Sequence, residues 1–586
     1  MYNDLVKIKI IFTEGLLLKM KDIPYYEVRD LTNLKQLVND SCEIYADKTA
    51  YLVKKNGKEE YQEIKYSQVK KDVDALGTAL IGLGLKDKRI AVIGENRYEW
   101  AISYLATITG VGIVVPLDRQ LPENELENCI KRSKVNALIY SSKIEDTINK
   151  LFTNFDNIEK YICFDDISDN GKFMSLSNLI KYGQKLLDDG NRNFLDAEID
   201  EEELAELLFT SGTTSEAKAV MLSHKNICFN IHEQCKMLKI VPEDVFLSVL
   251  PIHHTYECTC GFLTPLYRGA TVAYCEGLRH IQKNMQQSKV SVFLAVPLIF
   301  ETLYRKIWEG IEKQGKTKLV KKMIKITNAL DKVGIHIKRK VFKEIHAQLG
   351  GNVKVLIAGA AAINPEVSKG FRDFGILTVQ GYGLSECAPI VALNRDVDYK
   401  DDAAGLPLPN EEVKIDNPNE DGIGEIIVKG DHVMLGYYEN DEENAKALKN
   451  GWFYTGDLGF IDEDGFIHIT GRKKNVIITK NGKNIYPEEI ETLLIKSDYI
   501  KECMVYGKND KGDVKLAAEL VLDDDYIAEK FKDEPKTDEE IKKIVWEDIK
   551  KINSELVTYK HIKEINIRKT EFKKTTTMKI KRYLEK

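Results

Sequence analysis

Apolar residues in the first third of the chain alternate between helical spacing and short continuous runs. Tyr66 to Leu83 and Trp100 to Thr107 carry apolar residues at helical spacing. Continuous apolar runs at Arg89 to Ile93, Gly112 to Leu117 and Val135 to Tyr140 are typical of buried strands. Strands that alternate with helices form parallel sheets with helices on both faces. The pattern therefore predicts an α/β fold whose large N-terminal region holds mostly parallel, helix-covered sheets.

The pattern changes twice further along the chain. Beyond Asp402, short strands with frequent glycine predict a β-rich subdomain. Gly471 to Lys474 is a polar, basic break, which we interpret as a linker, and the chain after it combines strands with helices. One of these helices begins at Pro487, a residue that favours a first helical turn. The expected parts are an N-terminal extension at 1–30, a large domain at 31–471 with a β-rich subdomain at about 402–470, and a small α+β C-terminal domain at 472–586.

Size, charge and cysteine content narrow the class of protein. A chain of 586 residues is too long for a single core. Its net charge of 85 − 92 = −7 gives no reason to expect a nucleic-acid partner. Ten cysteines are scattered without metal-type or disulfide-type spacing, which predicts reduced thiols and a cytoplasmic location. The sequence does not indicate an oligomeric state.

Three segments bear on membrane contact. The longest uncharged run, Ala101 to Leu117, is shorter than the ~20 apolar residues of a spanning helix, so we expect no transmembrane segment. No clear cleavage site follows the apolar run Ile10 to Leu18, so we expect no signal peptide, and Met20 is an alternative start to Met1. Residues 301–350 are helical in pattern and rich in lysine. A solvated helix face is one interpretation of that segment, and peripheral contact with an anionic membrane is the sharper hypothesis.

A hydroxyl-rich loop is the first candidate for chemistry. It runs from Thr210 to Lys218 between two apolar runs. Its residues include Ser211, Gly212, Thr213 and Thr214. Hydroxyl and backbone N–H groups donate hydrogen bonds to a polyanion, glycine permits close approach, and lysine adds positive charge. The loop lacks the glycine–lysine–Ser/Thr spacing of a Walker loop, and an ordinary Ser/Thr-rich turn is the alternative interpretation.

Several predicted strand ends carry further candidates. One strand ends just ahead of His254, at an edge where α/β clefts usually open. Small residues at Gly359 to Ala362 and Gly381 to Gly383 allow a planar ligand to approach the backbone, and Tyr382 offers a ring for stacking. Glu386 provides a hard carboxylate for a divalent cation. A packing histidine and ordinary βα turns are the alternatives.

The order of these motifs resembles the adenylate-forming superfamily of acyl-CoA synthetases, peptide-synthetase adenylation domains and firefly-type luciferases. The resemblance covers roughly Leu34 to Arg582, with five motifs in register. The charged insertion between Glu301 and Gly350 is similar to that of long-chain fatty acyl-CoA synthetases. The resemblance implies that ATP, with Mg²⁺ as cofactor, activates a carboxylic acid to an acyl-adenylate. Transfer to coenzyme A would then release AMP, after pyrophosphate has left in the first step.

The resemblance also implies a role for each matching position. In the family, a phosphate loop, two adenine-holding segments and two ribose-binding groups contact the nucleotide. The matching cofactor-binding residues are Thr210, Ser211, Gly212, Thr213, Thr214, Lys218, Gly359, Ala360, Ala361, Gln380, Gly381, Tyr382, Gly383, Ser385, Asp457, Arg472 and the hinge residue Lys474. Catalytic roles fall to Lys579, Thr213, Glu386 and His254, with Glu386 and Thr213 as the Mg²⁺ ligands.

A few positions depart from the family pattern. Ser215, Ala217 and Ala219 stand where the family usually has glycine, proline and glycine. Losing two glycines removes freedom for positive φ, so we expect a less mobile phosphate loop. Met578 replaces the glycine that usually precedes the lysine at Lys579.

The substrates stay open in several respects. Medium-chain, long-chain and aromatic acids all fit the motifs. Coenzyme A is favoured as acceptor by the resemblance, and a carrier-protein phosphopantetheine arm, as in an acyl–acyl carrier protein ligase, is the alternative. A degenerate, non-catalytic nucleotide- or acyl-binding protein and a luciferase-type oxygenase are the remaining alternatives.

Overall fold

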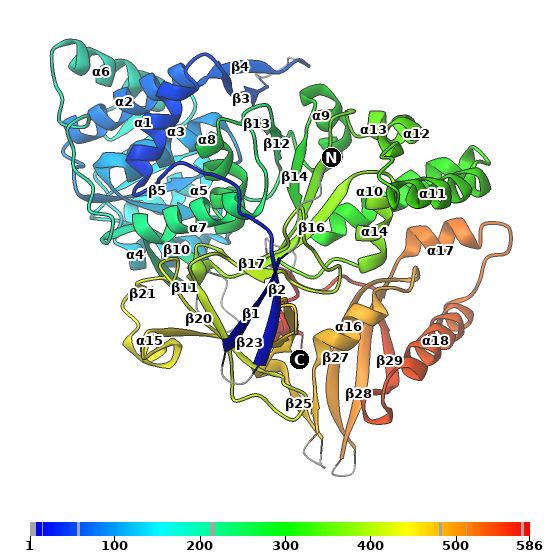
Figure 1. Cartoon of the computed structure of the whole chain (residues 1–586). Helices are drawn as coiled ribbons and strands as arrows, with labels where there is room; N and C mark the ends of the chain where they lie inside the picture. The colour runs from blue at the N-terminus through cyan, green and yellow to red at the C-terminus, as the bar shows by residue number, and fades with distance from the viewer. Residues whose placement is uncertain are drawn as a thin grey trace.

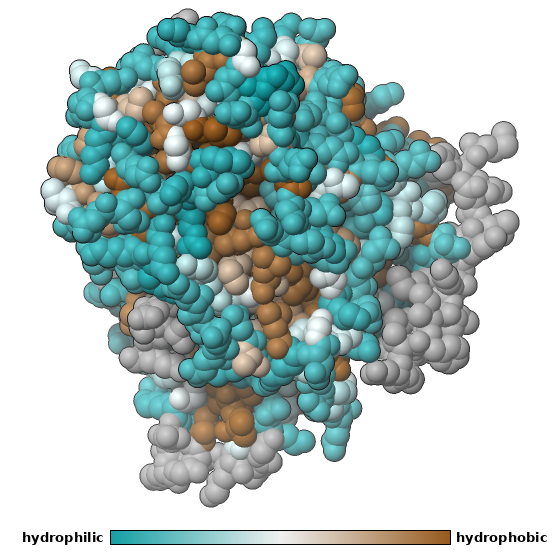
Figure 2. Space-filling model, turned by 90° about the vertical axis from the view of Figure 1, so that its left-hand side faces the viewer, coloured by the Kyte–Doolittle hydropathy of each residue, from teal (hydrophilic) through white to brown (hydrophobic). Residues whose placement is uncertain are grey.

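The computed structural model describes residues 7–13, 16–54, 59–210, 217–479, 483–510, 513–575 and 579–585. Two mostly parallel sheets with helices around them form the N-terminal region (Figure 1). This confirms the α/β fold expected from the alternating pattern. Hydrophilic residues cover most of the face seen in Figure 2, while hydrophobic residues gather along its centre.

The first sheet has eight strands in the order β21-β11-β10-β6-β5-β7-β8-β9. Neighbours from β10 to β9 run parallel, and β10, β11 and β21 are antiparallel to one another in turn. The strands are β5 (Lys88–Ile93), β6 (Gly112–Leu117), β7 (Ala137–Tyr140), β8 (Lys160–Cys163), β9 (Phe173–Ser175), β10 (Leu204–Thr210), β11 (Lys218–Ser223) and β21 (Gly436–Tyr437).

The second sheet has nine strands in the order β18-β17-β16-β15-β14-β12-β13-β3-β4. Its central strands from β16 to β3 run parallel, so their carboxyl ends lie along one edge. The strands are β3 (Thr49–Val53), β4 (Gln62–Lys65), β12 (Val245–Ser248), β13 (Thr271–Tyr274), β14 (Val292–Ala295), β15 (Val355–Ala358), β16 (Leu377–Gly383), β17 (Ile390–Leu393) and β18 (Leu406–Pro407).

Helices cover both sheets (Figure 1). The helices of this region are α1 (Leu34–Ile44), α2 (Tyr66–Gly82), α3 (Tyr98–Ala106), α4 (Glu123–Ser133), α5 (Glu145–Leu151), α6 (Leu176–Asp188), α7 (His224–Met237), α8 (Thr264–Arg268), α9 (Ile281–Ser288), α10 (Pro297–Lys313), α11 (Thr317–Asp331), α12 (Lys338–Val341), α13 (Lys343–Gln348) and α14 (Pro365–Asp373). One apolar core joins the two sheets and contains Ile90 of β5, Ile227 of α7 and Phe246 of β12. Among the described residues, no helix is long and apolar enough to cross a bilayer.

A β-rich subdomain follows, as the glycine-rich pattern predicts. It contains β19 (Glu412–Asp416), β20 (Gly424–Lys429), β22 (Leu448–Lys449), β23 (Trp452–Ile461) and β24 (Ile467–Arg472), with the short helix α15 (Asp441–Ala447) beside them. The expected linker at 471–474 needs a correction, because Gly471 and Arg472 still pair with β23. The break in regular strand structure begins with the 3₁₀ turn at Lys473–Asn475.

The C-terminal unit is the small α+β domain that the sequence predicts. Its sheets contain β25 (Ile477–Ile478) with β26 (Asn484–Ile485), and β27 (Ile500–Asp510), β28 (Asp513–Leu522) and β29 (Ile562–Arg568). Its helices are α16 (Pro487–Leu494), α17 (Asp524–Lys530) and α18 (Asp538–Glu555). Ile490, Leu520 and Val545 belong to a core of its own. A capping box between Thr537 and Glu540 starts α18.

The N-terminal extension contains a β-hairpin. Strand β1 (Lys7–Thr13) pairs antiparallel with β2 (Leu16–Asp22), with Lys7 opposite Asp22. Lys21 forms an ion pair with Asp398 at 2.7 Å, which links the end of the hairpin to the connection between β17 and β18. The sequence pattern predicts an N-terminal extension at 1–30 but does not predict this strand pairing.

Candidate active site

A cavity of about 130 Å³ lies at the carboxyl ends of the central strands of the second sheet. His254 follows β12, Gly359 follows β15 and Tyr382 is the next-to-last residue of β16. All three line the cavity. Lys579, from the C-terminal domain, lines the same cavity. The structure therefore brings together four of the positions that the motifs single out, from two domains.

Apolar side chains line much of this cavity. They are Leu238, Ile240, Phe246, Leu250, Leu294, Val296, Ile357, Ile390 and Leu393. Gln234, Glu257 and Cys260 add polar groups to the same wall. Burial raises the pKa of Glu257 to about 8, so this carboxyl is mostly protonated at neutral pH. A mostly apolar wall suits the hydrocarbon part of a carboxylic acid.

The small residues at the strand ends are required by close contacts. A Cβ on Gly359 would lie 2.6 Å from the Tyr256 ring, and one on Gly383 would lie 2.0 Å from the carbonyl oxygen of Pro389. Ala360 has φ +71, a backbone conformation that favours glycine. Gly359, Ala360, Gly381, Gly383 and Ser385 all line the cavity. Ala361 is exposed and is not among the residues that line it.

Gln380 has a structural use that the sequence did not predict. Its Nε2 donates to the carbonyl oxygens of Asp401 and Ala403, both at 2.9 Å, and its Oε1 accepts from the N–H of Ile363 at 3.1 Å. The side chain is buried and is not among those that line the cavity. Its side-chain amide thus links β16 to the segments that contain Ile363 and Asp401. A contact between adenine and the backbone of Gln380 stays a prediction.

Asp457 is the centre of a buried polar cluster. Its Oδ2 accepts from the hydroxyl of Tyr382 at 2.7 Å, and its Oδ1 pairs with Nε of Arg472 at 2.6 Å. Asp457 and Arg472 stand opposite each other on β23 and β24. Burial raises the pKa of Asp457, while Arg472 and Tyr382 act in the opposite direction. Strand pairing therefore brings together the two residues expected to bind ribose and the tyrosine expected to stack on adenine.

Glu386 lies in the 3₁₀ turn Ser385–Cys387, directly after β16. Its Oε1 accepts from the hydroxyl of Tyr437 at 2.8 Å, which fixes the carboxylate. Among the described residues no group of three or more histidine, cysteine or acidic side chains converges on one point. Mg²⁺ usually takes one or two carboxylates and completes its shell with phosphate oxygens and water, so a single oriented carboxylate fits this ion. The second expected ligand, Thr213, lies outside the described residues.

The two ends of the hydroxyl-rich loop are paired. Thr210 ends β10 and faces Lys218 at the start of β11, as expected for a turn between two buried strands. Lys218 forms an ion pair with Glu443, and its ammonium lies 4.7 Å from the centre of the Tyr437 ring. Because Tyr437 also holds Glu386, the base of the loop and the candidate metal ligand share one tyrosine. The predicted phosphate-binding residues Ser211, Gly212, Thr213 and Thr214 lie outside the described residues, as does Ser215.

The two histidines after β12 are neutral at neutral pH, and the side chain of His253 is buried. Burial, together with the nearby His253 and Lys579, lowers the pKa of His254 to about 3. The ring centroids of His253 and His254 are 5.4 Å apart. Of the two, only His254 lines the cavity. A neutral imidazole there offers a hydrogen bond or a packing surface and no positive charge.

Lys579 is held by a short turn near the end of the chain. Its N–H donates to Oγ1 of Thr575 at 3.1 Å, and Lys574 and Ile580 form an antiparallel bridge on either side. Although the residue as a whole is exposed, its side chain lines the cavity. Burial of the ammonium lowers the pKa of Lys579, as does Arg472, whereas Asp457 and Glu386 raise it. The lysine therefore lies within electrostatic range of both acidic groups of the site.

Lys474 lies in the 3₁₀ turn Lys473–Asn475 and is not among the residues that line the cavity. Burial lowers its pKa to about 8, and Arg472 contributes in the same direction. Its neighbour Lys473 pairs with Glu425 of β20 at 2.7 Å. A short turn anchored on one side to the β-rich subdomain is compatible with a hinge, which stays a prediction.

Sequence reasoning missed several residues of this site. Tyr437 stands 51 positions from Glu386 on an edge strand, and Tyr256 donates to the carbonyl oxygen of Ile357 at 3.0 Å across the cavity. Neither tyrosine belongs to a motif, and only their three-dimensional positions assign them to the site. Tyr256 follows His254 by two positions, and this closeness to the strand end was the one feature of the sequence that could have assigned it to the site.

Comparisons with known proteins agree with this geometry. The family model described as AMP-binding enzyme matches residues 38–438, and the model described as AMP-binding enzyme C-terminal domain matches residues 474–584. The chain belongs to the AMP-binding enzyme family. This confirms the family expected from the order of the motifs.

Curated relatives include long-chain-fatty-acid–CoA ligase 5 of Rattus norvegicus, 29% identical over 84% of this chain and 76% of that protein. Fatty acyl-CoA synthetase B of Dictyostelium discoideum is 25% identical over 83% of this chain and 77% of that protein. Among solved structures, the anthranilate CoA ligase AuaEII in complex with anthranoyl-AMP matches with a TM-score of 0.75 at 19% identity, covering 96% of this chain and 97% of that one. ATP-bound MatB from Rhodopseudomonas palustris matches with a TM-score of 0.72 at 22% identity, covering 94% and 98%. These structures share the two-domain α/β fold.

Proposed function

We propose that this AMP-binding enzyme couples a carboxylic acid to coenzyme A through an acyl-adenylate, with a medium- or long-chain fatty acid as the acid. In the first step a carboxylate oxygen bonds to the α-phosphorus of ATP, and the bond from that phosphorus to pyrophosphate breaks. In the second step the thiol sulfur of coenzyme A bonds to the acyl carbon, and AMP leaves. The observation that carries this proposal is the cavity where Lys579 of the C-terminal domain meets the strand ends of the large domain.

The first step brings one anion onto another, so positive charge must be in place before reaction. Lys579 supports that need, because its side chain enters a site that holds two carboxylates, those of Asp457 and Glu386. We assign the ammonium of Lys579 to the carboxylate and α-phosphate. Neutral His254 lines the cavity near it, where it orients the acid and leaves the charge balance unchanged.

The Asp457 cluster supports the nucleoside end of the same proposal. Tyr382 and Arg472 already occupy one oxygen each of this carboxylate. A ribose hydroxyl can donate to the remaining lone pairs, and the Tyr382 ring provides a face for adenine. We assign the hydroxyl-rich loop and Lys218 to the pyrophosphate side. Mg²⁺ bound at Glu386 would add positive charge to the phosphate oxygens, since the oriented carboxylate fits it.

The choice of a fatty acid is supported by the apolar cavity wall and by the curated relatives named for long-chain fatty acids. Aromatic acids are the second candidate, because the solved structure with anthranoyl-AMP shares the fold. Contact of 301–350 with a membrane stays a separate prediction, which the surface of α11 refines below.

Pyrophosphate exchange across a ladder of acids tests the proposal. Straight-chain acids of increasing length and benzoate-type acids are compared, and the acids that support exchange are then offered with coenzyme A or with holo acyl carrier protein. We expect exchange with an aliphatic acid and a thioester with coenzyme A. A thioester on the carrier protein alone would assign the acceptor differently. ATP binding without exchange for any acid would instead support a non-catalytic binding protein.

A further inference from the structure

The apolar residues of helix α11 extend beyond the side that packs on the core. The inner side packs on the core around α10 and α14 through Val320, Met323 and Ile324. On the outer side, Leu319 and Ile326 are 57% and 40% exposed. They are seven residues apart, so they lie on nearly the same side of the helix. The helix thus presents an apolar stripe that no described part of the chain covers.

The stripe continues past the end of the helix. Val333 and Ile335, in the turn after α11, are 71% and 49% exposed. Single exposed apolar residues are common on protein surfaces, but four of them lie within the segment 319–335, and we refer to these four as the apolar patch. Figure 1 places α11 at the outer edge of the molecule, so the patch is accessible from solvent.

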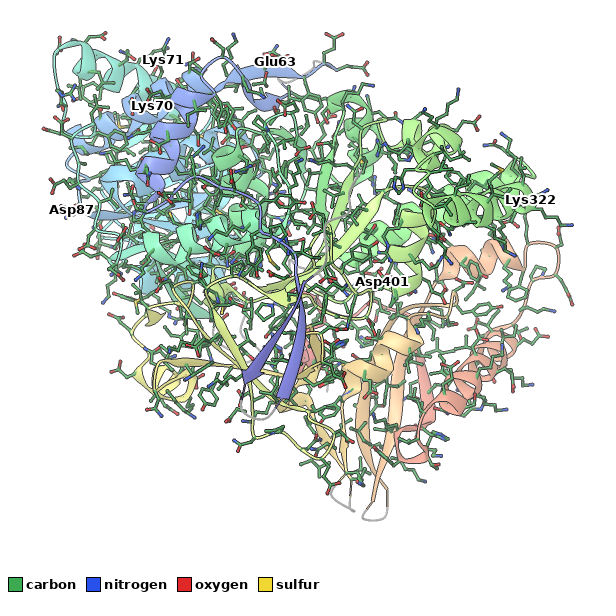
Figure 3. The ribbon with its side chains drawn as sticks, viewed as in Figure 1. Glu63, Lys70, Lys71, Asp87, Lys322 and Asp401 are labelled. Atoms are coloured by element: carbon green, nitrogen blue, oxygen red, sulfur yellow. The ribbon has the colours of Figure 1, made fainter. Side chains whose placement is uncertain are left out.

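Lysines without ion pairs surround this patch. Lys318, Lys322, Lys325 and Lys332 are exposed, and none of them forms an ion pair with a described residue. Figure 3 shows the side chain of Lys322 pointing away from the ribbon at the edge of the molecule. The segment 313–343 has ten lysines and one arginine against a single acid, Asp331. That acid is already paired with Lys338 at 2.7 Å.

Apolar side chains flanked by unpaired lysines match the chemistry of an anionic bilayer surface. In such a helix the apolar residues enter the boundary between headgroups and acyl chains, and the lysine ammonium groups meet the phosphates. A second copy of this chain is a poor partner for the same face, because a two-fold contact would oppose lysine to lysine. We propose that α11 and the turn after it dock on an anionic membrane, with Leu319 and Ile326 at the boundary.

Within the segment 301–350, α11 and the turn after it are the part that we expect to contact the membrane. Helix α10 buries Phe300, Leu303 and Ile307 in the core and exposes one large apolar residue, Leu298, at 43%, against two on α11. Helix α10 begins directly after Val296, which lines the cavity, and α11 packs on α10. The docking helix and the apolar end of the cavity therefore belong to one structural unit. Binding to vesicles is measured without turnover, so its result does not depend on whether the proposed ligase activity is correct.

Co-sedimentation of the full chain with vesicles tests the proposal. Vesicles of phosphatidylcholine alone are compared with vesicles of phosphatidylcholine mixed with phosphatidylserine. We expect binding to the mixed vesicles alone, and its loss at high salt. Each lysine near such a surface contributes roughly fivefold to binding, so K322Q/K325Q is expected to weaken it by about 25-fold. L319S/I326S is expected to weaken it as well, because the apolar stripe is removed.

Matched variants separate this surface from general effects of charge. K542Q/K543Q removes the same charge from exposed positions on α18, and Val557→Ser removes an apolar residue that is 53% exposed. Both controls are expected to bind vesicles like the unchanged protein. Equal losses in the K542Q/K543Q and K322Q/K325Q variants would overturn the assignment to α11. So would equal binding to neutral vesicles, or a dimer that K322Q/K325Q dissociates while vesicle binding is absent.

Discussion

Replacing Lys579 with alanine removes the one side chain that the described part of the C-terminal domain contributes to the cavity wall. The ammonium faces the acidic groups Asp457 and Glu386 and the cation Arg472. Without it, the carboxylate of the acid and the α-phosphate must approach with less positive charge between them. We expect formation of the acyl-adenylate to fail while ATP binding, which rests mainly on the large domain, is retained.

The magnitude follows from the position of the charge. Two unit charges 4 Å apart interact with about 4 kcal/mol at the effective dielectric of a partly exposed site. Lys579 is exposed as a residue, so water screens part of this interaction. A loss of about 3 to 4 kcal/mol from the transition state corresponds to a rate lowered by roughly 10²- to 10³-fold. The apparent affinity for ATP should change by less than about tenfold.

ATP–pyrophosphate exchange measures the first step, and Lys573→Ala is the matched control. Lys573 lies on the same terminal segment and is exposed, and it is not among the residues that line the cavity. The pKa of Lys579 is lowered from its ordinary value of 10.5, so exchange should fall as the pH rises through that lowered pKa. Lys579→Arg should keep its charge at higher pH and move this decline upward. Normal exchange in Lys579→Ala would refute the assignment.

Three further changes test other parts of the site. Asp457→Ala leaves the Tyr382 hydroxyl and Arg472 without their shared acceptor, so the KM for ATP should rise by roughly 10- to 100-fold in the exchange assay; an unchanged KM would remove its assigned role. Glu386→Gln should raise the Mg²⁺ concentration needed for half-maximal exchange by about tenfold, and an identical Mg²⁺ dependence would contradict the fit. Arg305 pairs with Asp523 of the C-terminal domain at 2.5 Å, so we expect this pair to favour the domain arrangement that catalyses adenylation. Arg305→Ala should then slow exchange by about two- to fivefold while thioester formation from added acyl-adenylate is unchanged. Equal slowing of both steps would contradict this role.

The apolar runs predicted most of the parallel strands because a strand buried on both faces needs apolar residues at every position. Arg89 to Ile93 and Gly112 to Leu117 became β5 and β6 with little change in their bounds. Strand β23 was harder to predict, since its buried positions include Thr455, Asp457 and Gly459. The alternation of apolar and polar residues that marks a half-buried strand cannot be seen in the sequence when the inward residues are polar or are glycine.

The site was predictable where motifs follow the chain and unpredictable where distant segments meet. Glu386 and Asp457 could be named from their motifs, but the hydroxyl of Tyr437 on Glu386 depends on an edge strand that pairs with β11. The amide of Gln380 serves the connections around β16, which a motif cannot distinguish from ligand binding. Side-chain partners of this kind depend on tertiary packing, and one sequence does not specify them locally.

The expectation of a less mobile phosphate loop depends on substitutions at three positions, and the structure describes two of them, Ala217 and Ala219. Ala219 lies in β11 opposite Phe209, and its carbonyl accepts from the N–H of Tyr438 at 2.8 Å. The carbonyl of Ala217 accepts from Nη1 of Arg132 at 2.6 Å. Neither alanine has the positive φ that would require glycine, so both fit without backbone strain. Alanine also loses less conformational entropy than glycine when such backbone is ordered, so Ala219, which stands at a family glycine position, stabilises the base of the loop. The expected loss of loop mobility therefore stays a prediction for Ser215, which lies outside the described residues.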